Sequence, residues 1–410
     1  MWYCIRQWSL SRRWLSQSDV DAVAMAERCD VLVVGAGPAG ALAARLLGMS
    51  RPNLRIVLLD AETTPLHRPC GEYLAPDGLR VIARAGLEQA ILATGAYRLS
   101  AVELHGPCGG WHAAFAPVLG LRPFRDHGLG VRREHFDRVL QDGAAVVADL
   151  RRGQRCSTMV RDGGRWVVDV VGSHGAYQIE TALIIGADGR GSTIRRSAGL
   201  DCRPTRKRFA LVCRAHGISH RDRVEMHLGP LGQIGLCPLG DGEVNLNLLL
   251  APPSAVLLRL MDRTRLLRVA LAVTPTVADR CRDVTLGPVM ASGSLPQGAS
   301  QVVADGVCLA GDAAGFCDPF TGEGMGIAAR CADLVVDAIT GQDFDRMPTR
   351  DELAPYANAF ALKIGRRRVI GEALQRILLR RRMAESVAAV IGRVPLLARL
   401  MVADAAGFTA

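Results

Sequence analysis

The stretch "DVLVVGAGPAGALAARLLG", residues 30–48, has the pattern of a strand, a tight turn and a helix. Residues 30–34 form a β-branched, almost entirely apolar run, which is typical of a parallel strand buried on both faces. The turn carries the pattern G-x-G-x-x-G, in which the first glycine permits the turn, the second admits a pyrophosphate, and the third lets helix pack on strand. The residues expected to contact a bound dinucleotide here are Gly35, Gly37, Ala39 and Gly40.

A second apolar run, "LRIVLLD" (residues 54–60), ends in an acid. Asp60 lies 20 residues beyond Gly40, a spacing at which a carboxylate accepts the ribose hydroxyls of an adenine dinucleotide. A lone G-x-G-x-x-G is weak evidence, but the two strands, the helix and the terminal acid together are specific. The sequence therefore predicts adenine-dinucleotide binding.

Composition sets the broad class of the chain. With 410 residues, 49% of them hydrophobic, the chain is long enough for two domains. Charges interrupt every apolar run before the roughly 20 residues that a transmembrane helix needs. The 12 cysteines are scattered without a Cys-x-x-Cys pair, which favours free thiols in a reducing compartment. We therefore expect a cytoplasmic protein.

The net charge of +10 does not by itself indicate nucleic-acid binding. Lysine occurs only at Lys207 and Lys363, the arginines are spread over the whole chain, and aromatic residues for base stacking make up only 5%. His216 and His220 have a spacing seen in metal sites, but no third ligand stands near them in the sequence. We expect neither a nucleic-acid partner nor a bound metal.

Two further glycine-rich segments contain acids. "GADGRGSTIRR" (residues 186–196) follows an apolar strand-like run, and "GDAAGFCDPFTGEG" (residues 311–324) follows another, "GVCLA". Taken alone, Asp312 could cap a following helix and the glycines could simply turn the chain. Asp188 occupies a similar position after the earlier strand.

In this order and spacing, the three segments resemble the flavoprotein monooxygenase superfamily of the para-hydroxybenzoate hydroxylase type. The likeness is greatest to its geranylgeranyl reductase and FixC-like group, and it covers roughly residues 29–407. The resemblance implies an α/β fold, with a split Rossmann-like FAD-binding domain of the GR2 type, an inserted antiparallel-sheet substrate domain and a helical C-terminal tail. It implies FAD as cofactor, with NAD(P)H as electron donor.

The expected domain boundaries follow the changes in pattern along the chain. Residues 1–27 are an N-terminal extension, unstructured or produced by a start site placed too far upstream, because Met25 directly precedes the first strand. The FAD-binding domain comprises residues 28–75, 130–200 and 288–345; the substrate domain comprises residues 76–129 and 201–287; residues 346–410 form C-terminal helices.

The resemblance also implies roles for individual residues. Asp312, after Gly311, holds the ribityl chain of FAD, and the Gly322–Gly324 turn brings a positively polarised helix N-terminus to the flavin. Asp188 lies near the pyrophosphate and the nicotinamide approach. The cationic residues expected beside the cofactor are Arg68 and Arg133.

Two segments point to the geranylgeranyl reductase group in particular. "RPCGEYL" (residues 68–74) places Cys70 where that group carries a Pro-Cys-Gly segment beside the flavin, although a small residue packing under the cofactor explains Cys70 as well. "GLCPLGDGEVNLNL" (residues 235–248) resembles the sheet segment that roofs the active site there, but lacks its usual aromatic residues.

The resemblance leaves the reaction open. A geranylgeranyl-reductase-like enzyme would saturate an alkene of a lipophilic, isoprenoid-like substrate, whereas a monooxygenase would hydroxylate an aromatic or polyketide substrate. A non-catalytic flavin-binding protein is the remote alternative, and no catalytic residue is assigned. The tail segment "GRRRVIGEALQRILLRRR" (residues 365–382) is predicted to form a basic amphipathic helix, which would either lie on an anionic membrane or cover the substrate domain.

Overall fold

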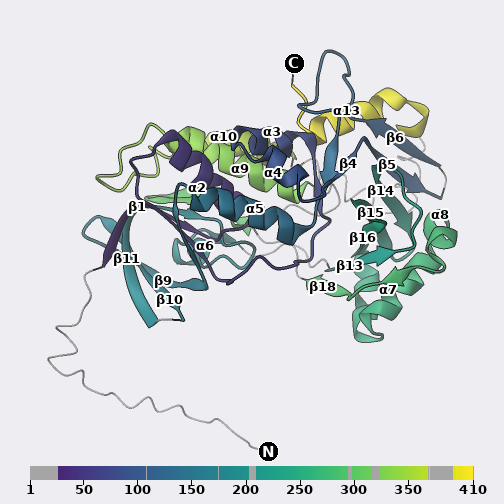
Figure 1. The fold of residues 1–410 in the computed structure, drawn as a ribbon, viewed down its shortest axis with the longest axis horizontal. Coiled ribbons are helices and arrows are strands. Elements are labelled where there is room, and N and C mark those ends of the chain that lie inside the picture. Colours follow the sequence, from purple (N-terminus) through teal and green to yellow (C-terminus); the bar gives the residue numbers. More distant parts are fainter. Residues whose placement is uncertain are drawn as a thin grey trace, which may run out of the picture.

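The computed structural model describes residues 26–107, 109–173, 175–202, 209–293, 298–315, 323–367, 369 and 391–409. Two sheets stand side by side and define two parts of the molecule, a parallel-sheet part and an antiparallel-sheet part (Figure 1). Residues 1–25, Gly322 and most of the predicted basic tail helix lie outside the described residues, and β1 begins at Glu27, inside the predicted N-terminal extension. No helix of the described segments is long and apolar enough to cross a membrane.

The parallel sheet has the strand order β20-β21-β11-β1-β2-β8. From β21 to β8 every neighbouring pair is parallel, and the residues of β1 between Val31 and Val33 are completely buried, as expected for a strand covered on both faces. Its strands are β1 (Glu27–Val34), β2 (Ile56–Asp60), β8 (Asp149–Arg152), β11 (Gly175–Gly186), β20 (Val303–Ala304) and β21 (Val307–Leu309). The predicted α/β class is confirmed.

Helices α2 (Pro38–Ser50), α5 (Arg133–Ala145) and α9 (Gly324–Ile339) pack together on this sheet (Figure 1). The buried face of α2 consists largely of glycine and alanine, so its neighbours can approach closely. The antiparallel hairpin of β9 (Gln154–Asp162) and β10 (Arg165–Gly172) extends from β11.

The second sheet has the order β17-β13-β16-β15-β14-β5-β6, with β18 paired to β13. All pairs are antiparallel except β14 with β5. Its strands are β5 (Ala101–Gly106), β6 (Gly109–Ala114), β13 (Phe209–His216), β14 (Arg223–Gly229), β15 (Gly232–Gly240), β16 (Glu243–Leu250), β17 (Thr285–Leu286) and β18 (Met290–Gly293).

Alternation along these strands gives the sheet two different faces. One face forms a second hydrophobic core with α7 (Arg263–Ala272), α8 (Pro275–Ala278) and the 3₁₀ segments η1 (Pro252–Arg259) and η2 (Asp279–Cys281). The other face turns toward the parallel-sheet part. The C-terminal helix α13 (Pro395–Ala405) packs beside β6 at the edge of the same sheet (Figure 1).

Short elements connect the two parts. The small sheet β3-β7-β4 joins them, and α3 packs against α9. These and the remaining elements are β3 (Tyr73–Leu74), α3 (Pro76–Arg84), α4 (Glu88–Leu92), β4 (Tyr97–Leu99), β7 (Gly128–Gly130), α6 (Thr193–Ser197), β12 (Asp201–Cys202), β19 (Gly298–Ala299), η3 (Gly311–Ala313), α10 (Ala354–Phe360) and the π-helical η5 (Ala361–Gly365).

The packing differs from the expected boundaries at two places. Helix α3, expected in the substrate domain, buries Leu79 and Ile82 in the core of the parallel-sheet part. Strand β18, expected in the FAD-binding domain, pairs with β13 of the antiparallel sheet. The sequence of each segment shows which side is buried, because α3 is amphipathic and β18 alternates. It does not show which of the two hydrophobic cores that side packs against.

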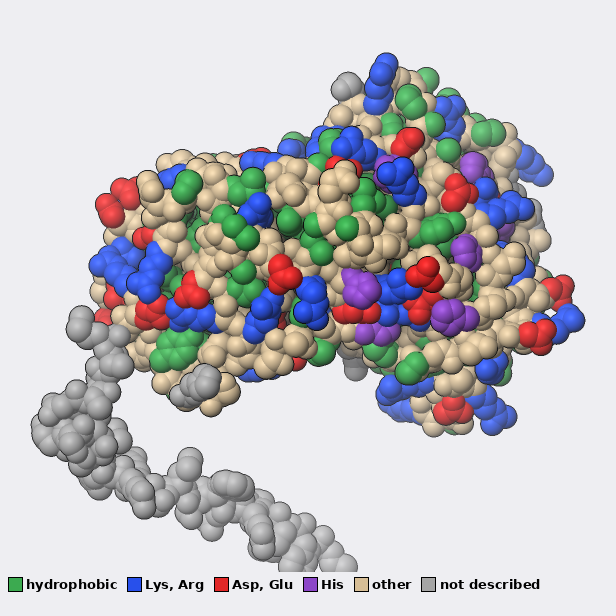
Figure 2. Space-filling view, in the orientation of Figure 1, with side chains coloured by type: hydrophobic (Ala, Val, Ile, Leu, Met, Phe, Trp, Pro, Cys, Tyr) green, Lys and Arg blue, Asp and Glu red, His purple; other side chains and the backbone are tan. Residues whose placement is uncertain are grey.

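Acidic and basic side chains lie among one another on the face of the molecule in Figure 2. Many arginines are paired; for example, Arg151 bonds Glu27 and Arg84 bonds Asp333 and Asp337. The positive net charge is therefore not concentrated in one stripe on this face.

Candidate flavin and substrate site

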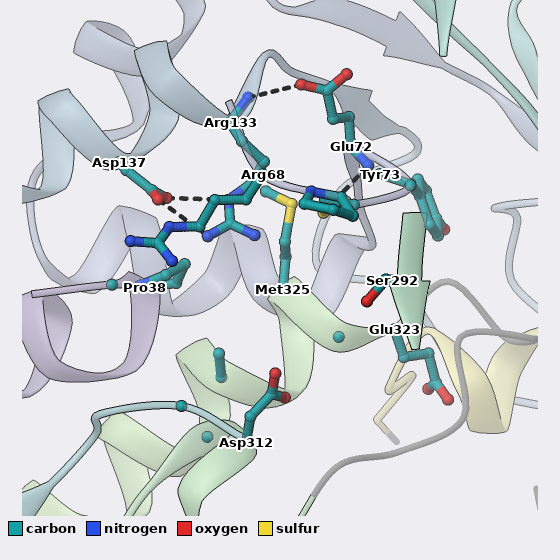
Figure 3. A pocket seen from close by; sticks show the side chains of 18 of the residues that line it. Pro38, Arg68, Glu72, Tyr73, Arg133, Asp137, Ser292, Asp312, Glu323 and Met325 are labelled. Carbon is teal, nitrogen blue, oxygen red and sulfur yellow. Dashed lines mark hydrogen bonds and ion pairs between the residues drawn. The ribbon is translucent and has the colours of Figure 1, made fainter. Parts of the chain in front are cut away.

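One cavity of about 810 Å³ connects the two parts of the molecule. Its parallel-sheet end is bounded by the turn after β1, the end of β2, the segment Pro65–Tyr73, α5 and the start of α9. Its other end is bounded by the inner face of the antiparallel sheet and by α13. Figure 3 shows the junction, with Arg133 and Asp137 on one side and Ser292 and Glu323 on the other.

The three glycines of the first turn have three different environments. A Cβ on Gly35, whose φ is +99°, would lie 2.4 Å from the carbonyl oxygen of Ala187, and one on Gly40 would lie 1.9 Å from the oxygen of Gly35. A Cβ on Gly37 would meet nothing within 4 Å, although Gly37 lines the cavity. The turn thus leaves an open space over Gly37, directly before the N-terminus of α2, where backbone N–H groups favour an anion.

Asp60 lies at the edge of this space with a fixed orientation. Its Oδ2 accepts from the backbone N–H of Ala36 at 3.0 Å, and its Oδ1 accepts from that of Glu62 at 2.8 Å. Burial raises the pKa of this carboxyl. Because each oxygen keeps a second lone pair, Asp60 can also accept a ribose hydroxyl. Arg68 lines the cavity nearby and forms an ion pair with Glu62 at 3.5 Å.

Arg133 and Cys70 both line the cavity, and their side chains lie close to each other. The guanidinium of Arg133 forms a bidentate pair with Asp137, one turn further along α5, at 3.1 and 2.9 Å (Figure 3). The Cys70 Sγ accepts from the backbone N–H of Glu72 at 3.3 Å. Burial raises the pKa of the Cys70 thiol despite the positive charge of Arg133, so at neutral pH this sulfur carries its proton.

Glu72 is a site residue that the sequence analysis missed. Its side chain is fully buried, and its carboxylate accepts from Arg214 on β13, from the Asn245 amide on β16 at 2.9 Å, and from the backbone N–H of Arg133 at 2.9 Å. Glu72 also has a φ of +55°, which is unusual for a residue with a side chain. The only signal in the sequence was an acid beside the Pro-Cys-Gly segment, because its partners lie far away along the chain.

Asp188 and Asp312 lie where two strands of the parallel sheet end. The Asp188 Oδ2 accepts from the N–H groups of Thr193 and Ile194, at 2.7 and 3.2 Å, and so holds the start of α6. Within the described residues its Oδ1 is buried with no hydrogen-bond partner. Burial raises the pKa of Asp312, against the positive charges of Arg190 and Arg133.

The glycines near Asp312 leave room for a bound group. Gly311 has a φ of +60°, and a Cβ there would lie 2.9 Å from the Cβ of Ala39, so a side chain is excluded. A Cβ on Gly324, at the start of α9, would meet nothing within 4 Å. Gly37, Gly324 and Asp188 all line one cavity, with open space over both glycines, and an elongated dinucleotide fits this arrangement.

A model of the family described as "FAD binding domain" matches residues 28–336. The chain belongs to this family. FAD is therefore its cofactor, and the chain is a flavin-dependent oxidoreductase, as predicted. Twelve of the predicted site residues are described. Eleven of them line the cavity, and Gly40 packs under the turn. Their individual roles toward FAD remain predictions.

Relatives of known name align over most of the chain. Digeranylgeranylglycerophospholipid reductase 2 of Methanopyrus kandleri is 28% identical over 344 residues, which cover 77% of this chain and 78% of the relative. Menaquinone reductase of Mycobacterium tuberculosis is 26% identical over 357 residues, covering 78% and 79%. Anhydrotetracycline monooxygenase of Streptomyces rimosus is 28% identical over 178 residues, covering only 42% and 33%.

A solved structure shows the same fold. The geranylgeranyl bacteriochlorophyll reductase-like protein of Thermoplasma acidophilum superposes with a TM-score of 0.72 at 19% identity, covering 89% of this chain and 92% of that protein. The alignments with named reductases confirm the predicted likeness to the geranylgeranyl reductase group, and the superposition shows that the fold is shared.

One group of potential metal ligands lies away from the cavity. His105, Glu225 and His227 have ligand atoms within 4.8 Å of one another, on the outer face of β5 and β14. Both carboxylate oxygens of Glu225 also accept from Arg280, at 2.5 and 3.1 Å. This positive charge opposes a cation at the same carboxylate, so we assign no metal to the group.

Proposed function

We propose that this chain is an FAD-dependent reductase that saturates a double bond in a lipophilic, isoprenoid-like substrate, with the flavin reduced by NAD(P)H or another donor. The observation that carries the proposal is one continuous cavity, which joins the FAD-binding turn and strand ends directly to an apolar wall. A cofactor bound at one end would present its ring to a substrate held at the other.

The substrate end of the cavity has the composition that a hydrocarbon chain requires. Apolar side chains of two adjacent strands and the C-terminal helix form its wall, and burying such a chain there is favoured by roughly 25 cal/mol per Å² of apolar area. The residues of this wall are Val102, Leu104, Val224, Met226, Met401 and Val402. The relatives named as reductases of lipids and of menaquinone align over about three quarters of the chain, which supports the same class of substrate.

FAD, when bound, would supply hydride-transfer chemistry, and the chain's own groups would place and protect it. The N-terminus of α2 and the open space over Gly37 suit the pyrophosphate, and Asp60 suits the ribose. Burial raises the pKa values of the Cys70 and Cys237 thiols, so both hold a proton at the cavity wall. The apolar wall is also compatible with hydroxylation of a lipophilic substrate, although hydroxylation does not require it.

Hydroxylation by a flavin monooxygenase is the second candidate. The alignment with anhydrotetracycline monooxygenase favours it, but that alignment covers less than half of this chain. Non-catalytic flavin binding is a third reading, in which added acceptors would never reoxidise reduced FAD.

Anaerobic single turnover distinguishes these functions. The FAD-loaded protein is reduced with dithionite or NADPH without oxygen and mixed with a geranylgeranyl lipid, and the product is followed by mass spectrometry. The reductase reading expects a mass gain of two hydrogens and reoxidation of the flavin. Product that forms only after oxygen is admitted, carrying one atom from labelled gas, would establish the hydroxylase instead. Bleaching of the flavin by NADPH or NADH separately tests the proposed donor.

A further inference from the structure

The cavity wall beside the Cys70–Glu72 segment carries amide groups. Strand β16 alternates, so Leu246 and Leu248 enter the outer core while Asn245 and Asn247 face inward. The inward residues of the neighbouring β15 are Gln233, Gly235 and Cys237. This part of the wall therefore contains two amides, Asn247 and Gln233, among apolar neighbours such as Val212 and Leu249.

The two asparagines, Asn245 and Asn247, differ in their hydrogen bonds. The Nδ2 of Asn245 donates to the carbonyl oxygen of Cys70 and to Glu72, both at 2.9 Å, and so holds the backbone of that segment. Asn247, two residues on, makes one long hydrogen bond, from Nδ2 to Oδ1 of Asn245 at 3.5 Å. Its amide is therefore available to a ligand while its neighbour is not.

Strand register explains how Asn247 reaches the cavity. Asn247 pairs directly with Gly235, and a Cβ on Gly235 would lie 2.7 Å from both terminal atoms of the Asn247 amide. The absence of a side chain at Gly235 thus makes the room in which this amide lies. A Cβ on Gly71 would be 3.9 Å from the Asn247 Nδ2, which places the amide against the Cys70–Glu72 segment.

Gln233 adds a second amide to the same wall. It pairs with Leu249 and is therefore a diagonal neighbour of Asn247 on the inner face. Its Oε1 is buried with no hydrogen-bond partner in the described part of the chain. Because this oxygen is an acceptor, only a hydrogen-bond donor on a bound group could satisfy it.

The opposite half of the wall is apolar along the same cross-strand row. Asn247 pairs with Gly235 on β15, which pairs with Met226 on β14. Met226 in turn pairs with Leu104 on β5. Strands are about 4.8 Å apart, so Leu104 lies about 14 Å from Asn247 across three spacings. The cavity is thus amphipathic, with its hydrogen-bonding end beside the FAD-binding segment and its hydrocarbon end toward α13.

We propose, on the basis of the reductase function above, that the substrate is an amphiphile whose reacting double bond is conjugated with a carbonyl group. The Asn247 Nδ2 donates to the carbonyl oxygen, and the hydrocarbon tail lies along β14 and β5. An isolated isoprenoid double bond would leave the Asn247 amide facing hydrocarbon. A conjugated carbonyl accepts from this amide, and its oxygen takes up negative charge during reduction, which a positioned N–H donor stabilises.

The reduction adds one hydride and one proton across the double bond. A hydride enters at the carbon β to the carbonyl, and the carbon–carbon π bond breaks as its electrons move toward the carbonyl oxygen. A proton from water then reaches the α carbon, so two C–H bonds replace one π bond. The two electrons come from FAD that a nicotinamide has reduced beforehand.

Binding to the oxidised, FAD-loaded protein tests the proposal without any turnover. Isothermal titration calorimetry compares 3-hexylcyclohex-2-enone with 1-hexylcyclohexene, which share ring and tail but differ in the carbonyl. The protein should bind the enone about tenfold more tightly or better, the factor that one hydrogen bond of about 1.4 kcal/mol gives. Asn247→Leu should reduce this ratio to about one while leaving hydrocarbon binding unchanged or tighter.

Met226→Ala is the matched control, because Met226 lies in the same row at the apolar end. It should weaken both ligands to a similar extent and keep the ratio. Equal affinities for the two ligands in the unaltered protein, a preference that survives Asn247→Leu, or binding of neither ligand would each overturn the proposal. Because no reaction occurs here, the reductase function is tested separately, in the anaerobic turnover experiment run with the enone as well as with the geranylgeranyl lipid.

Discussion

Replacing Glu72 with alanine should lower the free energy of unfolding by about 3 kcal/mol. The substitution removes one member of a buried ion pair, a change that typically costs about 3–5 kcal/mol. We expect the lower end because Arg214 keeps its second carboxylate, Glu134, at 2.7 Å. The N–H of Arg133 loses its acceptor, whereas the Asn245 amide retains the Cys70 carbonyl. Against a total of about 5–15 kcal/mol for an ordinary domain, this loss is large.

Backbone strain at this position offers an internal check. Glu72 has a φ of +55°, and alanine would bear the same strain, so the strain cancels in the comparison. Glycine adopts this conformation freely, so Glu72→Gly should be less destabilising than Glu72→Ala by about 1 kcal/mol. Urea unfolding followed by fluorescence measures both differences.

Glu134→Ala is the control, because Glu134 pairs with the same arginine from a partly exposed position. It leaves Arg214 with Glu72, and we expect a loss of less than about 1 kcal/mol. If Glu72→Ala and Glu134→Ala destabilise the protein to within about 1 kcal/mol of each other, the carboxylate of Glu72 does not hold the two parts together as described.

Three further predictions concern cofactor binding, acid stability and the tail. Gly37→Val should abolish FAD retention but leave the apoprotein folded, as judged by circular dichroism, because a Cβ there meets no protein atom within 4 Å. Gly40→Val should instead prevent folding, because its Cβ would lie 1.9 Å from a backbone oxygen. Burial raises the pKa of Glu225, but hydrogen bonds with His227 and Arg280 outweigh it and bring the value to about 2 from an ordinary 4.5. Its stabilising contribution is therefore complete above about pH 4.5 and lost as the pH falls toward 2, and Glu225→Gln should remove this part of the pH dependence of unfolding. Finally, if the basic segment 365–382 contacts membranes, the intact protein should float with anionic liposomes while a chain truncated before it should not; equal flotation would reject the contact.

The cofactor end of the cavity could be predicted because its determinants are local. The glycine turn, Asp60 and the acids after two strands each lie within a short segment whose spacing has a stereochemical meaning. Asp188 was only partly anticipated: one of its oxygens holds the start of α6, a role set by the backbone path after the strand.

The substrate end could not be predicted in the same way, because its determinants are pairings between distant segments. Glu72 and Arg214 are 142 residues apart, and nothing in either neighbourhood specifies the other. The missing aromatic residues around Gly235 were visible in the sequence, but that Asn247 fills the space follows only from the register of β15 and β16. Similarly, the amphipathic pattern of α3 indicated a buried side without indicating α9 as its partner.

Two buried ionic clusters fix the geometry between cofactor and substrate. At one end Glu72 joins the N-terminus of α5 to the antiparallel sheet. At the other, Arg367 bonds Asp77 of α3, Glu323 before α9 and the carbonyl oxygen of Ala405 in α13. Because α13 forms the substrate wall and α9 begins beside the proposed flavin position, a change at Arg367 would move the wall relative to the cofactor. Substitution of Arg367 should therefore alter which substrates react, as measured by the relative turnover of substrates that differ in chain length.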